Sequence, residues 1–170
     1  MEQVLDNSEV VEFECGDEDL NDFIINDAGN YHRHLLSESY LLKEGEHLIA
    51  YVTILNDSLD IDSFEDRTAF NRFRRKHFVN SKRLKSYPAI KIGRLAVQQK
   101  LSGKGYGSVL LDFVKVLTSL KRFSGCRFVT VDAYDEAIPF YEKNGFVVIS
   151  SSKSNSETTL MYYDLMAVKP

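Results

Sequence analysis

Three glycines alternate with other residues in the run 102–108, at Gly103, Gly105 and Gly107. The run follows a strand-like apolar stretch over 89–97 and precedes a helical pattern from 107 to about 123. Such spacing leaves backbone N–H groups uncovered at the positive end of a helix dipole, where an anion is favoured. Glycine also reaches the positive φ values of an anion-binding loop. The run predicts a site for a phosphorylated cofactor, although a plain strand-to-helix turn would use the same residues.

The spacing narrows the kind of cofactor. A nucleoside triphosphate loop of the Walker type needs an earlier glycine and a Ser or Thr after Gly-Lys, but Gln98 and Gly105 occupy those positions. A dinucleotide fingerprint needs a third glycine where Ser108 stands. The loop also lies past the middle of the chain, whereas that fingerprint opens the first βαβ unit. Neither common nucleotide motif fits.

Composition bounds the class of protein. The chain has 170 residues, 44% of them hydrophobic and 27% charged, so we expect one globular domain over 1–170. Its net charge of −4 argues against a general nucleic-acid binder. Cys15 and Cys126 form no metal motif, no apolar run is long enough for a membrane span, and residues 1–6 do not resemble a signal peptide. We expect a cytoplasmic protein with no metal and no membrane partner.

Charge is unevenly distributed along the chain. Residues 57–66 are acidic, and 67–85 hold eight of the 21 basic residues, interleaved with phenylalanines. We expect a charged helical insertion over 57–87. Its basic part is either a solvated helix face or a patch for an anionic substrate or phosphate backbone, with Arg74 and Arg75 as candidate substrate contacts. The acidic stretch could neutralise the basic one by folding against it.

Periodicity and turn residues predict the order of the remaining elements. A strand is expected over 10–15, a helix from 16 to about 34, and a hairpin of 39–43 with 47–54. The later part predicts a strand over 127–133, a helix over 136–143 ended by Asn144-Gly145, and strands over 146–150 and 158–168. This alternation indicates a mixed α/β (α+β) fold.

The array resembles the GCN5-related N-acetyltransferase (GNAT) family. One anchor is Arg94-Leu95-Ala96-Val97 with the glycine run, similar to the family's coenzyme A pyrophosphate motif. The other is Phe140-Tyr141-Glu142-Lys143-Asn144-Gly145-Phe146, similar to its aromatic-tyrosine-x-x-x-Gly-Phe signature. The resemblance implies a central, mostly antiparallel mixed sheet with a splayed parallel strand pair, flanked by helices. Ser102 and Tyr134 depart from the residues usual in the family.

The resemblance also implies a site for acetyl-CoA, formed by Leu95, Ala96, Val97, Ser102, Gly103, Lys104, Gly105, Tyr106, Gly107 and Ser108. Tyr141 stands where the family has its general acid toward the coenzyme A sulfur, the alternative being a core tyrosine. Arg94 either faces the acceptor pocket or is a solvated or ion-paired residue of the strand. For the general base, four residues are candidates by type only: His32, His34, His47 and Glu38.

Three functions follow as hypotheses. The first is an acetyl-CoA-dependent N-acetyltransferase, an acyltransferase acting on a primary amine of an unidentified substrate. The run 13–23 resembles the acetyltransferase toxins of toxin–antitoxin pairs, so the second is acetylation of aminoacyl-tRNA, with tRNA and a small antitoxin as partners. Against it stand a pI near 5.6 and the charged insertion. The third is a coenzyme A-binding module without catalysis. A homodimer is left open.

Overall fold

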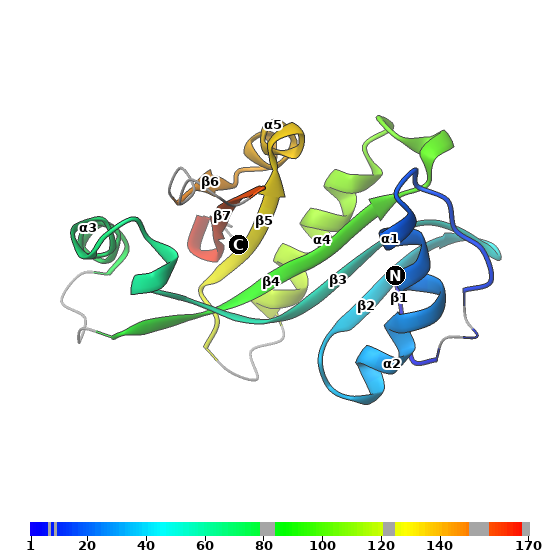
Figure 1. The fold of residues 1–170 in the computed structure, drawn as a ribbon, viewed down its shortest axis with the longest axis horizontal. Coiled ribbons are helices and arrows are strands. Elements are labelled where there is room, and N and C mark those ends of the chain that lie inside the picture. The colour runs from blue at the N-terminus through cyan, green and yellow to red at the C-terminus, as the bar shows by residue number, and fades with distance from the viewer. Residues whose placement is uncertain (7, 9, 79–83, 121–124, 150–156, 168–170) are drawn as a thin grey trace. The chain divides into compact units, whose positions relative to one another are not determined.

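The computed structural model describes residues 1–6, 8, 10–78, 84–120, 125–149 and 157–167 (Figure 1). The chain divides into two compact units, one of residues 1–55 with 92–117 and one of 56–91 with 118–170. Seven strands form one mixed sheet with a single parallel pair, in the order β1-β2-β3-β4-β5-β7-β6. Within the described residues, none of the helices is long and apolar enough to cross a membrane.

The strands of the first unit form an antiparallel arrangement. The two-residue strand β1 (Glu2–Gln3) pairs with β2 (Glu38–Glu44), which pairs with β3 (His47–Asp60) in the expected hairpin. The strand β3 is longer than predicted because its apolar alternation continues past residue 54 with Leu59, which is fully buried. Next comes β4 (Ser86–Val97), and both β3 and β4 contribute residues to each unit.

The predicted helix after residue 16 is present, but it is not uniform. It consists of α1 (Glu18–Asp22), a π-helical turn (Phe23–Asp27) and α2 (Ala28–Arg33). Asp17 begins it by accepting hydrogen bonds from the N–H groups of Asp19 and Leu20, at 3.0 and 3.2 Å. The strand predicted over 10–15 is wrong, because this described segment is irregular and makes its hydrogen bonds with loops and side chains.

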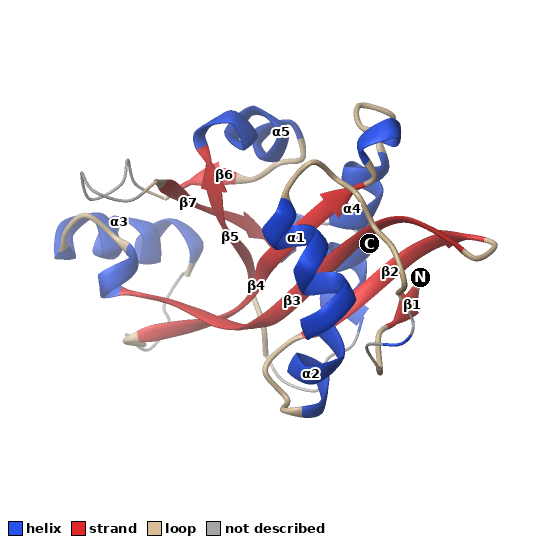
Figure 2. Cartoon of the chain, turned by 45° about the vertical axis from the view of Figure 1, so that its right-hand side comes forward, coloured by secondary structure: helices blue, strands red, loops and turns tan. Residues whose placement is uncertain are grey.

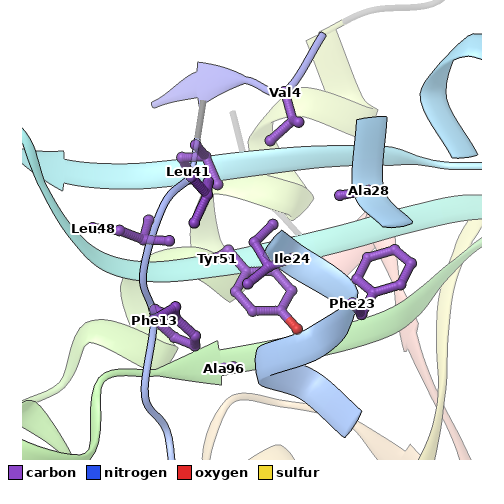
Figure 3. Packing of buried hydrophobic residues seen from close by; sticks show 10 residues of the cluster. Val4, Phe13, Phe23, Ile24, Ala28, Leu41, Leu48, Tyr51 and Ala96 are labelled. Carbon is purple, nitrogen blue, oxygen red and sulfur yellow. The ribbon is translucent and has the colours of Figure 1, made fainter. Parts of the chain in front are cut away.

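Helices cover both faces of the sheet in the first unit (Figures 1 and 2). On one face, Phe23, Ile24 and Ala28 of the N-terminal helices join Leu41 and Tyr51 in a buried cluster (Figure 3). On the other face lies α4 (Tyr106–Leu120), whose Phe113 ring meets the Tyr40 ring edge-on at 5.1 Å. Neighbouring strand residues point to opposite faces, so Tyr40 packs against α4 and Leu41 packs against the N-terminal helices.

The second unit contains an antiparallel pair of strands that are distant in the sequence. Strand β5 (Phe128–Tyr134) pairs antiparallel with β7 (Thr158–Asp164), which also pairs with the two-residue β6 (Val147–Val148). Helix α5 (Ile138–Lys143) connects β5 to β6 and ends as predicted, with Gly145 at φ 85° after it. The segment between the strands predicted over 146–150 and 158–168 lies largely outside the described residues.

The charged insertion is less helical than predicted. Strand β3 continues through Asp60, and β4 begins at Ser86, so the helical part is a 3₁₀ turn (Ile61–Ser63) and helix α3 (Arg67–His77). The phenylalanines Phe70 and Phe73 bury the inner face of α3 against Phe64, Tyr87, Phe128 and Tyr162. The predicted fold class, a mixed sheet flanked by helices, is confirmed.

Candidate functional site

The glycine run forms a tight loop between β4 and α4. After β4 the chain makes a 3₁₀ turn (Gln99–Leu101), and Ser102 leaves it in an extended conformation. Gly103 and Gly105 then adopt φ values of 75° and 91°, which other residues reach only with strain. A Cβ atom on either glycine would meet no protein atom within 4 Å. The glycines are therefore required by the backbone conformation, and the space beside them is open to a ligand.

The backbone N–H groups of the loop lie at the N-terminus of the long helix α4. The first hydrogen bond of α4 joins the Val109 N–H to the Gly105 carbonyl at 3.2 Å. The N–H groups of Tyr106, Gly107 and Ser108 belong to the first turn, which has no acceptor inside the helix. Lys104 is exposed beside them. Open amides, a helix dipole and a cation together favour a pyrophosphate.

The N-terminal segment contacts the residues that lead from β4 into the glycine loop. No pattern in the sequence predicts this contact. The Gln99 N–H donates to the Glu14 carbonyl at 2.9 Å, and the Gln98 N–H donates to the Ile49 carbonyl at 2.8 Å. The Glu14 carboxylate in turn accepts from the Asn21 side chain and the Gly16 N–H, which lower the pKa of Glu14. The run 13–23 thus orders the strand end that feeds the glycine loop.

Arg94 and Ala96 point to the face of the sheet that the N-terminal helices cover. The Arg94 guanidinium carbon lies 3.6 Å from the centre of the Phe23 ring and 5.8 Å from that of Tyr31. Ala96 is 4% exposed and packs in the same cluster as Phe23. Leu95 and Val97 alternate with them and are half-buried. Arg94 therefore makes a cation–π contact, and its place in an acceptor pocket stays a prediction.

Tyr141 lies on α5 in the second unit and is 7% exposed. Its ring meets Phe140 and Phe146 edge-on, at 5.1 and 5.4 Å, and burial raises its pKa to about 12. Tyr141 is thus packed like a core residue, but its hydroxyl stays protonated at neutral pH and is available as a donor.

Two of the four base candidates come together. His32 Nδ1 lies 2.7 Å from Glu38 Oε2, and Gln3 donates to the same carboxylate oxygen. His34 instead contacts the Asn30 carbonyl at 2.8 Å at the exposed end of α2. His47 is exposed at the start of β3. A carboxylate beside an imidazole orients the ring, so Glu38 fixes the orientation of His32.

The basic candidates differ in their surroundings. Arg74 donates to Asn71 and to the Leu84 carbonyl and lies over the Phe70 ring, so it is held by its own unit. Arg75 is exposed. The basic residues at 82 and 83 lie outside the described residues.

His77 forms a network that the sequence does not reveal. Its Nδ1 lies 2.9 Å from Asp164, and its Nε2 lies 3.1 Å from the Tyr162 hydroxyl. Arg127 donates twice to Asp164, at 2.6 and 2.9 Å. These partners lie 85 and 87 positions from His77, so no local pattern could pair them.

The match to known proteins agrees with this geometry. Residues 38–148, about two thirds of the chain, match the family described as "Acetyltransferase (GNAT) domain". The matched range includes the glycine loop and the Tyr141 signature. The chain belongs to the GNAT acetyltransferase family. The predicted family, the enzyme class and acetyl-CoA as cosubstrate are thereby confirmed. No curated protein matches the chain.

Solved structures with the same fold include acetyltransferase toxins. A bacterial toxin superposes with a TM-score of 0.75 at 20% identity, over 94% of this chain and 88% of that one. AtaTR bound with AcCoA gives 0.74 at 22%, over 98% and 93%. AtaT complexed with acetyl-methionyl-tRNAfMet gives 0.72 at 21%, over 92% and 87%. At this identity the likeness concerns the fold.

Among the described residues, no group of three or more His, Cys, Asp or Glu could hold a metal ion.

Proposed function

We propose that this protein transfers the acetyl group of acetyl-CoA directly to a primary amine. The observation that carries the proposal is the open glycine loop, with Gly103 and Gly105 at positive φ before the 15-residue helix α4. The pyrophosphate of the coenzyme accepts hydrogen bonds from the loop and first-turn N–H groups. Backbone groups of Leu95, Ala96 and Val97 bind the pantetheine arm, as the family resemblance implies.

The reaction needs alignment and the transfer of two protons. The amine nitrogen attacks the thioester carbon, the C–S bond breaks, the nitrogen loses a proton, and the sulfur gains one. Holding the two reactants together can contribute on the order of 7–11 kcal/mol in ideal cases. An N–H of the β4 strand polarises the thioester carbonyl. The base that takes the amine proton is either a side chain such as His32 or a chain of water molecules.

In this proposal Tyr141 donates to the sulfur. Burial raises the pKa of Tyr141 to about 12, whereas a thiol has an ordinary pKa near 8.5. Full transfer to a free thiolate would be uphill by about 3.5 pK units, roughly 5 kcal/mol. Tyr141 is therefore better suited to concerted proton transfer than to stepwise protonation of a thiolate that has already left. In the concerted step, the hydrogen bond from the phenol to the sulfur strengthens, and the proton moves, while the C–S bond breaks.

A second, narrower candidate is acetylation of the amino group of aminoacyl-tRNA. Toxins of this fold superpose over nearly the whole chain, and one was captured as AtaT with acetyl-methionyl-tRNAfMet. Another structure contains AtaT bound to the C-terminus of the antitoxin AtaR. The run 13–23 favours the same branch, and here it orders the entry to the glycine loop. A small antitoxin would then be a partner of this chain.

Transfer of radiolabelled acetyl groups distinguishes the two candidates. The purified protein is incubated with labelled acetyl-CoA and aminoacylated tRNA, with uncharged tRNA as the matched control. Label that appears only on charged tRNA supports the second candidate. Release of coenzyme A with a panel of small primary amines, without label on tRNA, supports the general function alone. No transfer to any amine, despite bound acetyl-CoA, would contradict both.

A further inference from the structure

The outer face of helix α3 carries a cluster of positively charged side chains. The eleven residues of α3 include five Arg or Lys residues and no Asp or Glu. Arg72, Arg75 and Lys76 are exposed, and at 3.6 residues per turn they fall within an arc of about 100°. Phe70, Phe73 and His77 occupy the opposite arc, which faces the core of the second unit.

Three of the five acidic residues before α3 accept hydrogen bonds from groups outside the basic face. Asp60 accepts from the N–H groups of Asp62 and Ser63, and Asp66 accepts from the Ala69 N–H at 2.7 Å. Asp57 accepts from the Thr130 hydroxyl. Within residues 57–78, all of them described, no salt bridge joins an acidic to a basic side chain. These three carboxylates serve as helix caps or as a contact to β5, so none of them is ion-paired with the basic face.

Helix α3 is also held rigidly at its C-terminal end. His77, whose side chain is 9% exposed, contacts Asp164 and Tyr162 of β7. Arg74 donates to the Leu84 carbonyl and lies over the Phe70 ring. Arg74 therefore has a structural task, and the side chains left for a partner are Arg72, Arg75 and Lys76. A cationic face whose backbone is already ordered loses less conformational entropy on binding an extended anion than a flexible segment would.

We infer that the Arg72–Arg75–Lys76 face of α3 is a docking surface for the phosphate backbone of RNA. This inference rests on the proposal that aminoacyl-tRNA is the acceptor. Phosphates recur at short spacing along a nucleic-acid strand, and contacts from Lys and Arg to these phosphates supply affinity without base specificity. The face thus binds the tRNA body without reading its base sequence.

The test measures binding of fluorescein-labelled, uncharged bulk tRNA at several salt concentrations. The variant Arg72→Glu with Arg75→Glu is compared with Arg33→Glu with Lys143→Glu, which removes equally exposed charges elsewhere and gives the same net charge. We expect the α3 variant to weaken binding roughly 10- to 50-fold at about 0.1 M salt and to reduce the salt slope by about 2. The control should change affinity less than threefold. Both variants must keep the wild-type melting temperature within a few degrees, and Arg72→Gln with Arg75→Gln replaces the α3 variant if it does not.

Several outcomes overturn the inference. One is an unchanged affinity and slope in the α3 variant, and another is an equal loss in the control, which would indicate net charge alone. A third is a wild-type protein that ignores tRNA but binds poly-glutamate through α3, which would indicate an acidic protein partner. Because uncharged tRNA tests docking and charged tRNA tests transfer, failure of the surface and failure of the proposed function are distinguishable.

Discussion

The carbonyl oxygen of Gly105 accepts the N–H of Val109 at 3.2 Å, so a glycine at φ 91° is the residue from which helix α4 begins. This one contact combines two requirements. The backbone must turn through a conformation that favours glycine, and the amides that follow must be left facing outward. A side chain at this position would strain the loop and would occupy the open space beside it.

The first prediction concerns this residue. The Gly105→Val variant should bind acetyl-CoA at least tenfold more weakly by calorimetry, because the branched side chain occupies the place of the pyrophosphate. Gly45→Val is the matched control, since Gly45 also has positive φ, 59°, and open space around it, but lies in the β2–β3 turn. The control should lose stability without losing affinity. Equal affinities in the two folded variants would rule out the loop as the coenzyme site.

The second prediction concerns Tyr141. Tyr141→Phe removes the donor and keeps the ring, so kcat should fall by about 10²–10⁴-fold while acetyl-CoA affinity changes little. Because burial raises the pKa of Tyr141 to about 12, ionisation of this group should cause no loss of kcat between pH 7 and 10. Pre-steady-state kinetics must show that chemistry limits turnover. An unchanged kcat under that condition would leave Tyr141 with a packing role only.

The third prediction concerns acid stability. Burial acts to raise the pKa of Asp164, but hydrogen bonds from Arg127, the Met166 N–H and His77 outweigh it and hold the pKa below its ordinary 3.8. A lowered folded-state pKa stabilises the protein above about pH 4, and this contribution is lost as pH falls through the folded-state pKa. Asp164→Asn should therefore cost about 1.5–3 kcal/mol at pH 7, the worth of hydrogen bonds to a charged group.

Urea unfolding at pH 7, 5 and 3 checks this prediction. The stability difference between wild type and Asp164→Asn should be the same at pH 7 and 5 and should shrink at pH 3. A difference that stays constant down to pH 3 would show that the Asp164 charge contributes nothing to the network.

The fourth prediction concerns the end of α2. Leu35 has φ 58° and is 86% exposed, and its N–H and that of Leu36 donate back to His32 and Tyr31, each at 2.9 Å. This arrangement is a Schellman cap, which glycine fits best. Leu35→Gly should raise the free energy of unfolding by about 0.5–1 kcal/mol, since relief of left-handed strain exceeds the added chain entropy. Leu36→Gly, beside it without positive φ, should lower stability by a similar amount, and the opposite order would contradict the assigned cap.

The predictable parts of the structure were those set by neighbouring residues. Glycine spacing located the loop before α4, Asn144-Gly145 located the end of α5, and the β2–β3 hairpin followed from alternation around a glycine turn. The strand predicted at 10–15 failed because these residues bond to Asn21 and Gln99, and only the folded chain brings those partners close. The π-helical turn at Phe23 lies within an otherwise regular helical pattern, where Phe23 packs against Arg94 of a distant strand.

The site divides in the same way. The coenzyme loop could be predicted because one short run contains it. Asp60 and Asp66 cap helical turns and form no ion pair with the basic side chains of α3, a use that a count of charges along the sequence does not reveal. The His77–Asp164–Arg127 network joins helix α3 to strand β7 across 87 positions of the chain, and residue types alone do not specify it.

Backbone amide exchange at the glycine loop tests the central claim most directly. Hydrogen–deuterium exchange of residues 103–108 is measured with and without saturating acetyl-CoA, and exchange at the Gly45 turn serves as the internal reference. If the pyrophosphate is held by these amides, their exchange should slow by at least tenfold while the reference stays unchanged. Acetyl-CoA that binds with no protection at 103–108, or protects a different segment, would contradict the assignment of this loop as the coenzyme site.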